Sequence, residues 1–140
     1  MKNTLESLRG KRNLLQEKLK GIENFRRGII SVNYRKCGKK NCACAQQGHP
    51  GHGPQYLWNT TIKGKSFAKN LRVGPEIQKY KEETENYRGF LKICEELVET
   101  SEKICNSEPV VVIEDDRDLA ELKKKLQMHF AKKLKKKLNA

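Results

Sequence analysis

The sequence predicts an α+β fold in which a small β-element lies between long amphipathic helices. Three observations lead to this prediction. Apolar residues recur at helical spacing near both ends and through the middle of the chain, they alternate as in β-strands over two short segments, and three cysteines and two histidines crowd into residues 37–52. Because only 36% of the 140 residues are hydrophobic and 34% are charged, we expect a small core.

The first helix is expected over residues 3–25, within an N-terminal amphipathic segment of residues 1–27. Asn3 is the expected cap, because Glu6 follows it at the spacing of a capping box, and Gly28 is expected to end the helix. Apolar side chains recur along one seam, at Leu5, Leu8, Leu15, Leu19 and Ile22.

Two short segments alternate apolar and polar residues as β-strands do. The alternating positions are Ile30, Val32 and Tyr34 in the first segment and Tyr56, Trp58, Thr60 and Ile62 in the second. Lys63, Gly64 and Lys65 then supply the turn of a hairpin. Trp58 is the only tryptophan in the chain, and we expect it to pack under the hairpin rather than stack on a ligand.

The longest predicted helix begins at Pro75, which suits the first helical position, and runs to Cys105. Its heptad seam consists of Ile77, Tyr80, Thr84, Tyr87, Leu91, Cys94, Val98, Ser101 and Cys105. This seam is expected to pair with the N-terminal helix or with its copy in another subunit. Residues 28–105 are therefore predicted to combine the β-element with its long helix.

A linker over residues 106–116 and a basic amphipathic helix over residues 117–140 complete the predicted organisation. Asp115 or Asp116 is expected to cap this last helix. The apolar face of the helix consists of Leu119, Leu122, Leu126, Phe130, Leu134 and Leu138. The helix can act as an arm along a phosphate backbone, or its apolar stripe can dock on the acidic middle helix.

The net charge of +13 is unevenly distributed. Residues 11–40, 63–72 and 117–140 hold ten, four and nine basic residues against two, none and two acidic ones, whereas residues 75–116 hold five basic and twelve acidic residues. Such cationic regions favour a polyanionic partner, nucleic acid before an anionic membrane. No apolar run approaches the roughly 20 residues of a membrane span, and no signal peptide is visible, so we expect a cytoplasmic protein.

Residues 32–54 form a basic segment that is rich in side chains of the kinds that bind metals. Three of its cysteines have the spacing C-x4-C-x-C, two histidines follow, and Zn²⁺ prefers four such thiolate and imidazole ligands in a tetrahedron. The predicted ligands of a structural Zn²⁺ are Cys37, Cys42, Cys44 and His52, with His49 as the alternative to His52. We prefer His52 because the motif His-Gly-Pro places it at the mouth of the hairpin. The predicted architecture is thus a zinc-stapled β-hairpin or three-stranded element flanked by long amphipathic helices.

Other roles remain open for these cysteines. A C-x-C pair beside lysines can exchange disulfides, which would make the chain a thiol redox protein, but no thioredoxin-like βαβ pattern surrounds the pair. The cysteines can also lie in a basic turn without any metal. A zinc hydrolase or deaminase needs a general base near the metal, and residues 36–54 contain no Asp or Glu. We therefore predict that the protein is not an enzyme.

The motifs RKCGKKNCACAQQGHPGHGPQYLW, KGKSFAKNLRV and YKEETENYRGF follow one another in the chain. They resemble a small uncharacterised bacterial and archaeal domain family with the signature Cys-Gly-Lys-x-x-Cys-x-Cys, a variable loop, His-Gly-Pro-Tyr and a Gly-Lys hairpin turn. The resemblance covers roughly residues 27–91. It implies the ligands Cys37, Cys42, Cys44 and His52, although Gln55 stands where the family has an aromatic residue. Members often lie near transposase genes, which implies an association with mobile elements.

We therefore expect a non-enzymatic, zinc-containing nucleic-acid-binding accessory protein, with DNA favoured over RNA. The residues expected to contact phosphates are Lys36, Lys39, Lys40, Lys63, Lys65, Lys69, Arg72, Lys132, Lys133, Lys135, Lys136 and Lys137. The members on the cysteine loop and the hairpin can form one contiguous surface, which Arg26 and Arg27 extend. The alternative is a protein–protein adaptor that dimerises through its helical seams or docks on a recombinase.

Overall fold

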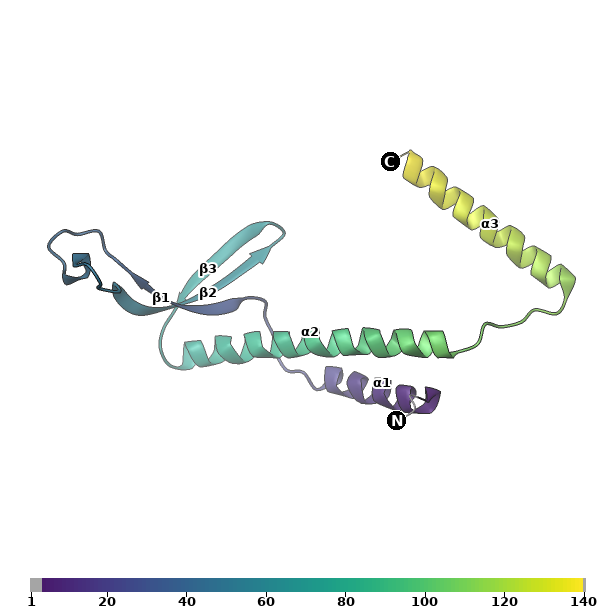
Figure 1. Ribbon diagram of the computed structural model, residues 1–140, viewed down its shortest axis with the longest axis horizontal. Helices are drawn as coiled ribbons and strands as arrows, with labels where there is room; N and C mark the ends of the chain where they lie inside the picture. Colours follow the sequence, from purple (N-terminus) through teal and green to yellow (C-terminus); the bar gives the residue numbers. More distant parts are fainter. Residues whose placement is uncertain (1–3, 140) are drawn as a thin grey trace. The chain divides into compact units, whose positions relative to one another are not determined.

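The computed structural model describes residues 4–139, and it confirms the predicted α+β class (Figure 1). The elements in chain order are helix α1 (Leu5–Lys20), strand β1 (Ile29–Arg35), a short 3₁₀ helix η1 (Ala43–Ala45), strands β2 (His52–Ile62) and β3 (Lys65–Leu71), and helices α2 (Pro75–Ser107) and α3 (Asp116–Leu138). The chain divides after Cys105 into two units, so the sheet and α1 belong to one unit and α3 to the other.

The three strands form one antiparallel sheet in the order β1-β2-β3. Between β2 and β3 the turn has two residues, Lys63 and Gly64, both with positive φ, and Ile62 pairs with Lys65 across it. Positive φ at both central residues is typical of the tight turns that match the twist of paired strands. The hairpin and its turn are therefore as predicted.

Helix α1 is shorter than predicted. Thr4 caps it, because its hydroxyl accepts a hydrogen bond of 3.2 Å from the backbone N–H of Ser7; the predicted cap, Asn3, lies outside the described residues. The helix ends at Gly21 rather than near Gly28. Glycine is a poor helix former, and the residues that follow bond to α2 instead of continuing the helical ladder.

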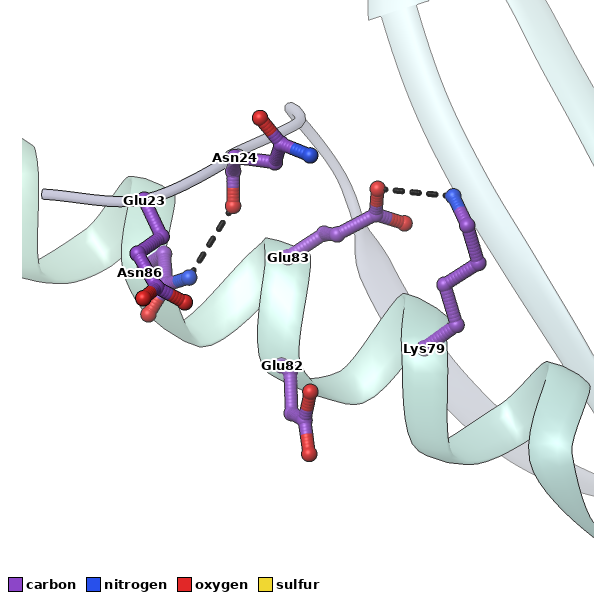
Figure 2. A pocket seen from close by; sticks show the side chains of 6 residues that line it. All are labelled: Glu23, Asn24, Lys79, Glu82, Glu83 and Asn86. Carbon is purple, nitrogen blue, oxygen red and sulfur yellow. Dashed lines mark hydrogen bonds and ion pairs between the residues drawn. The ribbon is translucent and has the colours of Figure 1, made fainter.

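The segment between α1 and β1 is tied to α2 through its backbone. The side-chain amide of Asn86 donates to the carbonyl of Asn24 over 2.9 Å, and the N–H of Arg26 donates to the carbonyl of Glu83 over 3.1 Å. A hollow of about 380 Å³ lies beside these bonds. Figure 2 shows the side chains that line it, among them Lys79, which reaches the carboxylate of Glu83 over 2.9 Å. This extended segment therefore cannot swing freely before the sheet begins.

Arg26 lies between the sheet and α2. Its guanidinium lies 3.8 Å from the centroid of the Tyr80 ring, and its Nε is 3.0 Å from a carboxylate oxygen of Glu83. The N–H is not directed at that oxygen, so the contact is an ion pair rather than a hydrogen bond. The sequence analysis assigned Arg26 to a basic surface. The cation instead packs on an aromatic face, which attracts it through the ring quadrupole.

Trp58 joins the same cluster from the sheet, which agrees with its predicted packing under the hairpin. It meets Tyr80 edge-on with 5.7 Å between ring centroids, and its indole N–H donates to the carbonyl of Arg27 over 2.9 Å. Gly28 has a φ of +117°, and a Cβ there would lie 2.4 Å from the indole nitrogen. Gly28 is therefore required for the close approach of Trp58 and does not end a helix.

The heptad seam predicted along α2 is correct only in its first half. Tyr80 and Thr84 are buried, but Leu91 and Val98 are 47% and 55% exposed. In the second half the covered stripe is shifted by one residue and includes the buried Thr100 and Ile104. Apolar residues occupy two adjacent stripes there, and their periodicity alone does not reveal which one has a partner.

Helix α1 is the partner of the shifted stripe. It runs antiparallel beside the C-terminal half of α2 in Figure 1, and its Leu8 and Leu15 are 5% and 3% exposed. Of the two pairings expected for α2, the one with the N-terminal helix is therefore present within the chain.

Helix α3 forms the second unit together with the linker. The carboxylate of Asp115 caps it by accepting hydrogen bonds from the backbone N–H groups of Arg117 and Asp118, at 2.8 and 3.1 Å. None of its described residues is buried. Among the residues that the structure describes, no helix is both long and apolar enough to cross a membrane.

The contact of Arg26 with Tyr80 predicts a measurable loss of stability. Arg26→Met should lower the free energy of unfolding by about 1–2 kcal/mol, because it removes the cation from the ring and leaves Glu83 without that charge. Arg27→Met is the matched control and should change it by less than about 0.5 kcal/mol. Urea unfolding followed by Trp58 fluorescence measures both, and equal losses would contradict the assignment.

Candidate metal centre

The pairing of β1 with β2 brings the first and last candidate ligands together. The two strands pair from Ile29 with Asn59 to Arg35 with His52, with an irregularity in register before Arg35. Cys37 follows β1 by two residues and His52 begins β2. Because an antiparallel pair places the end of one strand beside the start of the next, both side chains meet at the same end of the sheet.

The loop between these strands folds back through η1 to supply the other two ligands. Cys42 precedes η1 and Cys44 lies within it. The turn is held by hydrogen bonds from the N–H of Ala45 to the carbonyl of Cys42 at 2.9 Å and from the N–H of Cys42 to the carbonyl of Lys39 at 3.3 Å. Cys44 is only 1% exposed, so its thiol faces the interior of the loop.

The four side chains form one compact cluster of ligand atoms. The sulfurs of Cys37, Cys42 and Cys44 and a ring nitrogen of His52 all lie within 4.8 Å of one another. The Cys37 and Cys44 sulfurs are 3.5 Å apart, and Nε2 of His52 is 3.1 Å from the Cys42 sulfur. A tetrahedral ion such as Zn²⁺ separates its sulfur and nitrogen ligands by about 3.5–3.8 Å. The Cys₃His cluster can therefore hold a metal ion with only small movements.

A family model covers the part of the chain that contains this cluster. The model of a domain of unknown function, DUF6788, matches residues 5–79. The chain belongs to the DUF6788 family. No curated protein and no solved structure shows significant similarity to it.

The extent of the DUF6788 domain differs from the resemblance found in the sequence. The match begins at residue 5, so it includes α1, which the sequence analysis left outside the resemblance. It ends at residue 79, so most of α2, including the Asn86-Tyr87-Arg88 segment, lies beyond it. The cluster of ligands, the whole sheet and the segment that carries Arg26 lie within it.

Hydrogen bonds lower the pKa of one thiol in the candidate metal cluster. The backbone N–H of Lys39 and then the His52 ring and the Cys44 thiol bond to Cys37, and they lower the pKa of the Cys37 thiol to about 6. The backbone N–H of Cys37, 3.5 Å from the Cys44 sulfur, also favours a thiolate there, but burial and the neighbouring thiols outweigh it and raise the pKa of Cys44. A cation between them would stabilise all the thiolates.

His49, the alternative ligand, has a different place in the domain. Its Nδ1 accepts a hydrogen bond of 3.0 Å from the backbone N–H of Gly51, and it does not belong to the group of ligand atoms described above. Gly51 is buried with a φ of +105°, and a Cβ there would lie 2.7 Å from the backbone of Arg35. The sequence analysis missed this close approach, for which the run Gly-His-Pro-Gly-His-Gly is the only sequence signal.

The basic side chains expected to bind nucleic acid do not form one surface across the domain. Lys36, Lys39 and Lys40 are exposed on the cysteine loop. Lys63 and Lys65 are exposed at the hairpin turn, which is at the other end of β2. Ten residues of extended chain separate the two ends of β2, which corresponds to about 33 Å. The expected contiguous surface of loop and hairpin lysines is therefore absent.

The other residues expected to contact phosphates lie on β3, just after β3 and on α3. Lys69 faces α2, where it donates to the Tyr80 hydroxyl over 3.3 Å and lies 3.4 Å from the carboxylate of Glu76. These partners raise the pKa of Lys69, the Tyr80 bond contributing most. Arg72 is exposed just after β3. The remaining members are exposed on α3, in the second unit, at Lys132, Lys133, Lys135, Lys136 and Lys137.

The two histidines can be distinguished by metal retention. After loading with Zn²⁺ and desalting, His52→Ala should retain much less metal than the unmodified chain, with the dissociation constant raised by at least about tenfold, because one of four ligands is lost. His49→Ala should retain about one equivalent, since it removes only a loop hydrogen bond. Elemental analysis measures both, and the reverse result would assign the ligand to His49.

Proposed function

We propose that this protein is a non-enzymatic, zinc-containing nucleic-acid-binding accessory protein, associated with a mobile element. The donor set supports zinc as the metal, because thiolate and imidazole ligands suit Zn²⁺, whereas Mg²⁺ and Ca²⁺ take oxygen ligands. The metal joins the end of β1, the start of β2 and η1. Its role is therefore to hold the shape of the loop.

A structural rather than catalytic metal is supported by the closed ligand set. Catalytic zinc sites have three protein ligands and leave a position for water, whereas Cys37, Cys42, Cys44 and His52 provide four. No carboxylate occurs in residues 36–54 to act as a general base. Both features favour a binding protein over a zinc enzyme.

The observation that carries the proposal is the place of the loop lysines. Lys39 and Lys40 lie between two of the ligands, Cys37 and Cys42, and Lys36 precedes the first. All three are exposed. A metal that fixes the backbone on both sides of Lys39 and Lys40 holds three cations close together at no further entropic cost, which suits contact with successive phosphates.

Binding by these cations does not require a particular base sequence. Lysine reaches phosphates as a point charge, and phosphate contacts position a protein on nucleic acid without specifying sequence. The lysines of α3 offer a second cationic group in the other unit. We propose duplex DNA as the ligand, in keeping with the association with mobile elements that the sequence resemblance implies.

The salt dependence of DNA affinity tests this function. The affinity for a generic duplex should fall steeply with salt, and replacing Lys36, Lys39 and Lys40 by Gln should lower the slope of log K against log salt by up to about 2.7, or about 0.9 for each lost phosphate contact. Fluorescence anisotropy over a salt series measures the slope. The metal content of the triple variant should be unchanged.

The matched control replaces Lys63 and Lys65 at the far end of the sheet by Gln. These residues lie away from the metal loop and should change the slope less than the loop residues do. Absence of binding at low salt, or a triple variant indistinguishable from the unmodified chain, would contradict the proposal. Tighter binding to an RNA duplex of the same length would redirect it to RNA.

A further inference from the structure

The face of the sheet that points away from α2 carries no charged and no aromatic side chain. Trp58 and Lys69 contact Tyr80 of α2, and because side chains alternate along a strand, the neighbours of these residues point to the other face. None of the residues on this open face is buried. The strand register places there Ile29, Ser31, Asn33, Gln55, Leu57, Asn59, Thr61, Ser66, Ala68 and Asn70.

Three amide side chains of the open face form a row near the end of the sheet that carries the candidate metal cluster. Asn33 of β1 is directly opposite Gln55 of β2, and Asn70 of β3 is opposite Leu57, two residues further along β2. Adjacent strands are about 4.8 Å apart, so the row crosses the sheet over about 10 Å. This amide row, Asn33, Gln55 and Asn70, contains one side chain from each strand.

The side chains of the amide row are exposed, and no hydrogen bond to another described residue engages them. Asn59, further along the same face, differs from them. Its side-chain amide donates to the Ser31 hydroxyl over 3.0 Å and to the Leu57 carbonyl over 3.4 Å. Because each primary amide has two N–H donors and a carbonyl acceptor, the amide row offers both kinds of group to an external ligand.

Cations lie beside the amide row. Gln55 lines a hollow of about 320 Å³ together with Arg35, Lys36, Cys37 and His52. Arg35 and Lys36 are exposed. Neutral donors and acceptors on the sheet thus adjoin the positive charge of the cysteine loop. A polyanion that is held by these cations would have its uncharged groups close to the amide row.

We propose that the amide row reads base edges in the major groove of duplex DNA, while Arg35 and the loop lysines hold the flanking phosphates. This inference rests on the proposed function and adds a sequence preference to it. The major groove is about 12 Å wide, and each base pair presents a distinct pattern of donors and acceptors there. Asn and Gln match adenine, because one amide accepts from N6 and donates to N7 at the same time. The preferred sites should therefore contain A·T pairs.

Other macromolecules fit the open face less well. The cores of protein interfaces are enriched in aromatic residues, Met and Arg, and none of these types occurs on the open face. In an RNA duplex the major groove is too deep and narrow for side chains to read the bases. A flat row of uncharged amides beside cations therefore suits DNA best.

Selection from a random duplex library tests the sequence preference. The zinc-loaded full chain should enrich sites with A·T pairs. It should bind a selected duplex at least about fivefold more tightly than a shuffled duplex of the same composition, because one good amide–adenine pair discriminates by about that factor. Replacing the selected adenines by 7-deazaadenine removes the N7 acceptor from the major groove and should lower the affinity by a similar factor.

Variants assign the preference to the amide row. Combining Asn33→Ala, Gln55→Ala and Asn70→Ala should make the affinities for the selected and shuffled duplexes equal within about twofold, with the slope of log K against log salt unchanged because no phosphate contact is lost. Thr61→Ala with Ser66→Ala is the matched control. These two residues are exposed and paired at the hairpin end of the same face, so their loss should leave the preference intact. Metal content and helix content are measured for each variant to exclude unfolding.

The outcomes separate this inference from the proposed function. Salt-dependent binding without an enriched sequence, or an amide variant that keeps the preference, would overturn base reading and leave the proposed function intact. An affinity that is indifferent to 7-deazaadenine would likewise overturn reading from the major groove. Absence of binding at low salt would overturn both.

Discussion

The pairing of β1 with β2 up to Arg35 and His52 is the constraint on which the candidate metal centre depends. It places Cys37 and His52 at one end of the sheet, although fourteen residues lie between them in the chain. The close approach of Gly51 to the backbone of Arg35 allows the loop to close over that end. The turn around η1 then supplies Cys42 and Cys44. A metal bound here would in turn stabilise the strand pairing that assembled its ligands.

Aromatic and charged side chains attach the sheet to α2. Trp58, Tyr80 and Arg26 meet at the centre of this attachment. Burial raises the pKa of Tyr80, but the hydrogen bond from Lys69 and the charge of Arg26 outweigh it and hold that pKa below its ordinary value. Two cations thus contact Tyr80, Arg26 at the ring and Lys69 at the hydroxyl. Basic residues in this chain serve packing as well as surface charge.

Exposed charges of opposite sign lie on different elements of the chain. Lys36, Lys39 and Lys40 lie beside the candidate ligands on the cysteine loop, whereas Glu95, Glu99 and Glu102 are exposed along the second half of α2. The first unit therefore carries exposed charge of opposite sign in two places, positive on the cysteine loop and negative on α2. A protein with a small core would gain from a bound metal, because metal binding adds stability that the core does not supply.

The sequence by itself determined the α+β class, the strands and the hairpin turn, because these depend on local spacing. It left two residues open for the cap of α3, Asp115 and Asp116, and two for the fourth ligand, His52 and His49. Only the tertiary structure decided which α2 stripe α1 covers, because apolar residues occupy both of the adjacent stripes. It also showed that Arg26 packs on Tyr80, that Gly28 admits Trp58, and that the loop and hairpin lysines lie at opposite ends of β2. These features depend on contacts between distant segments, which no local pattern encodes.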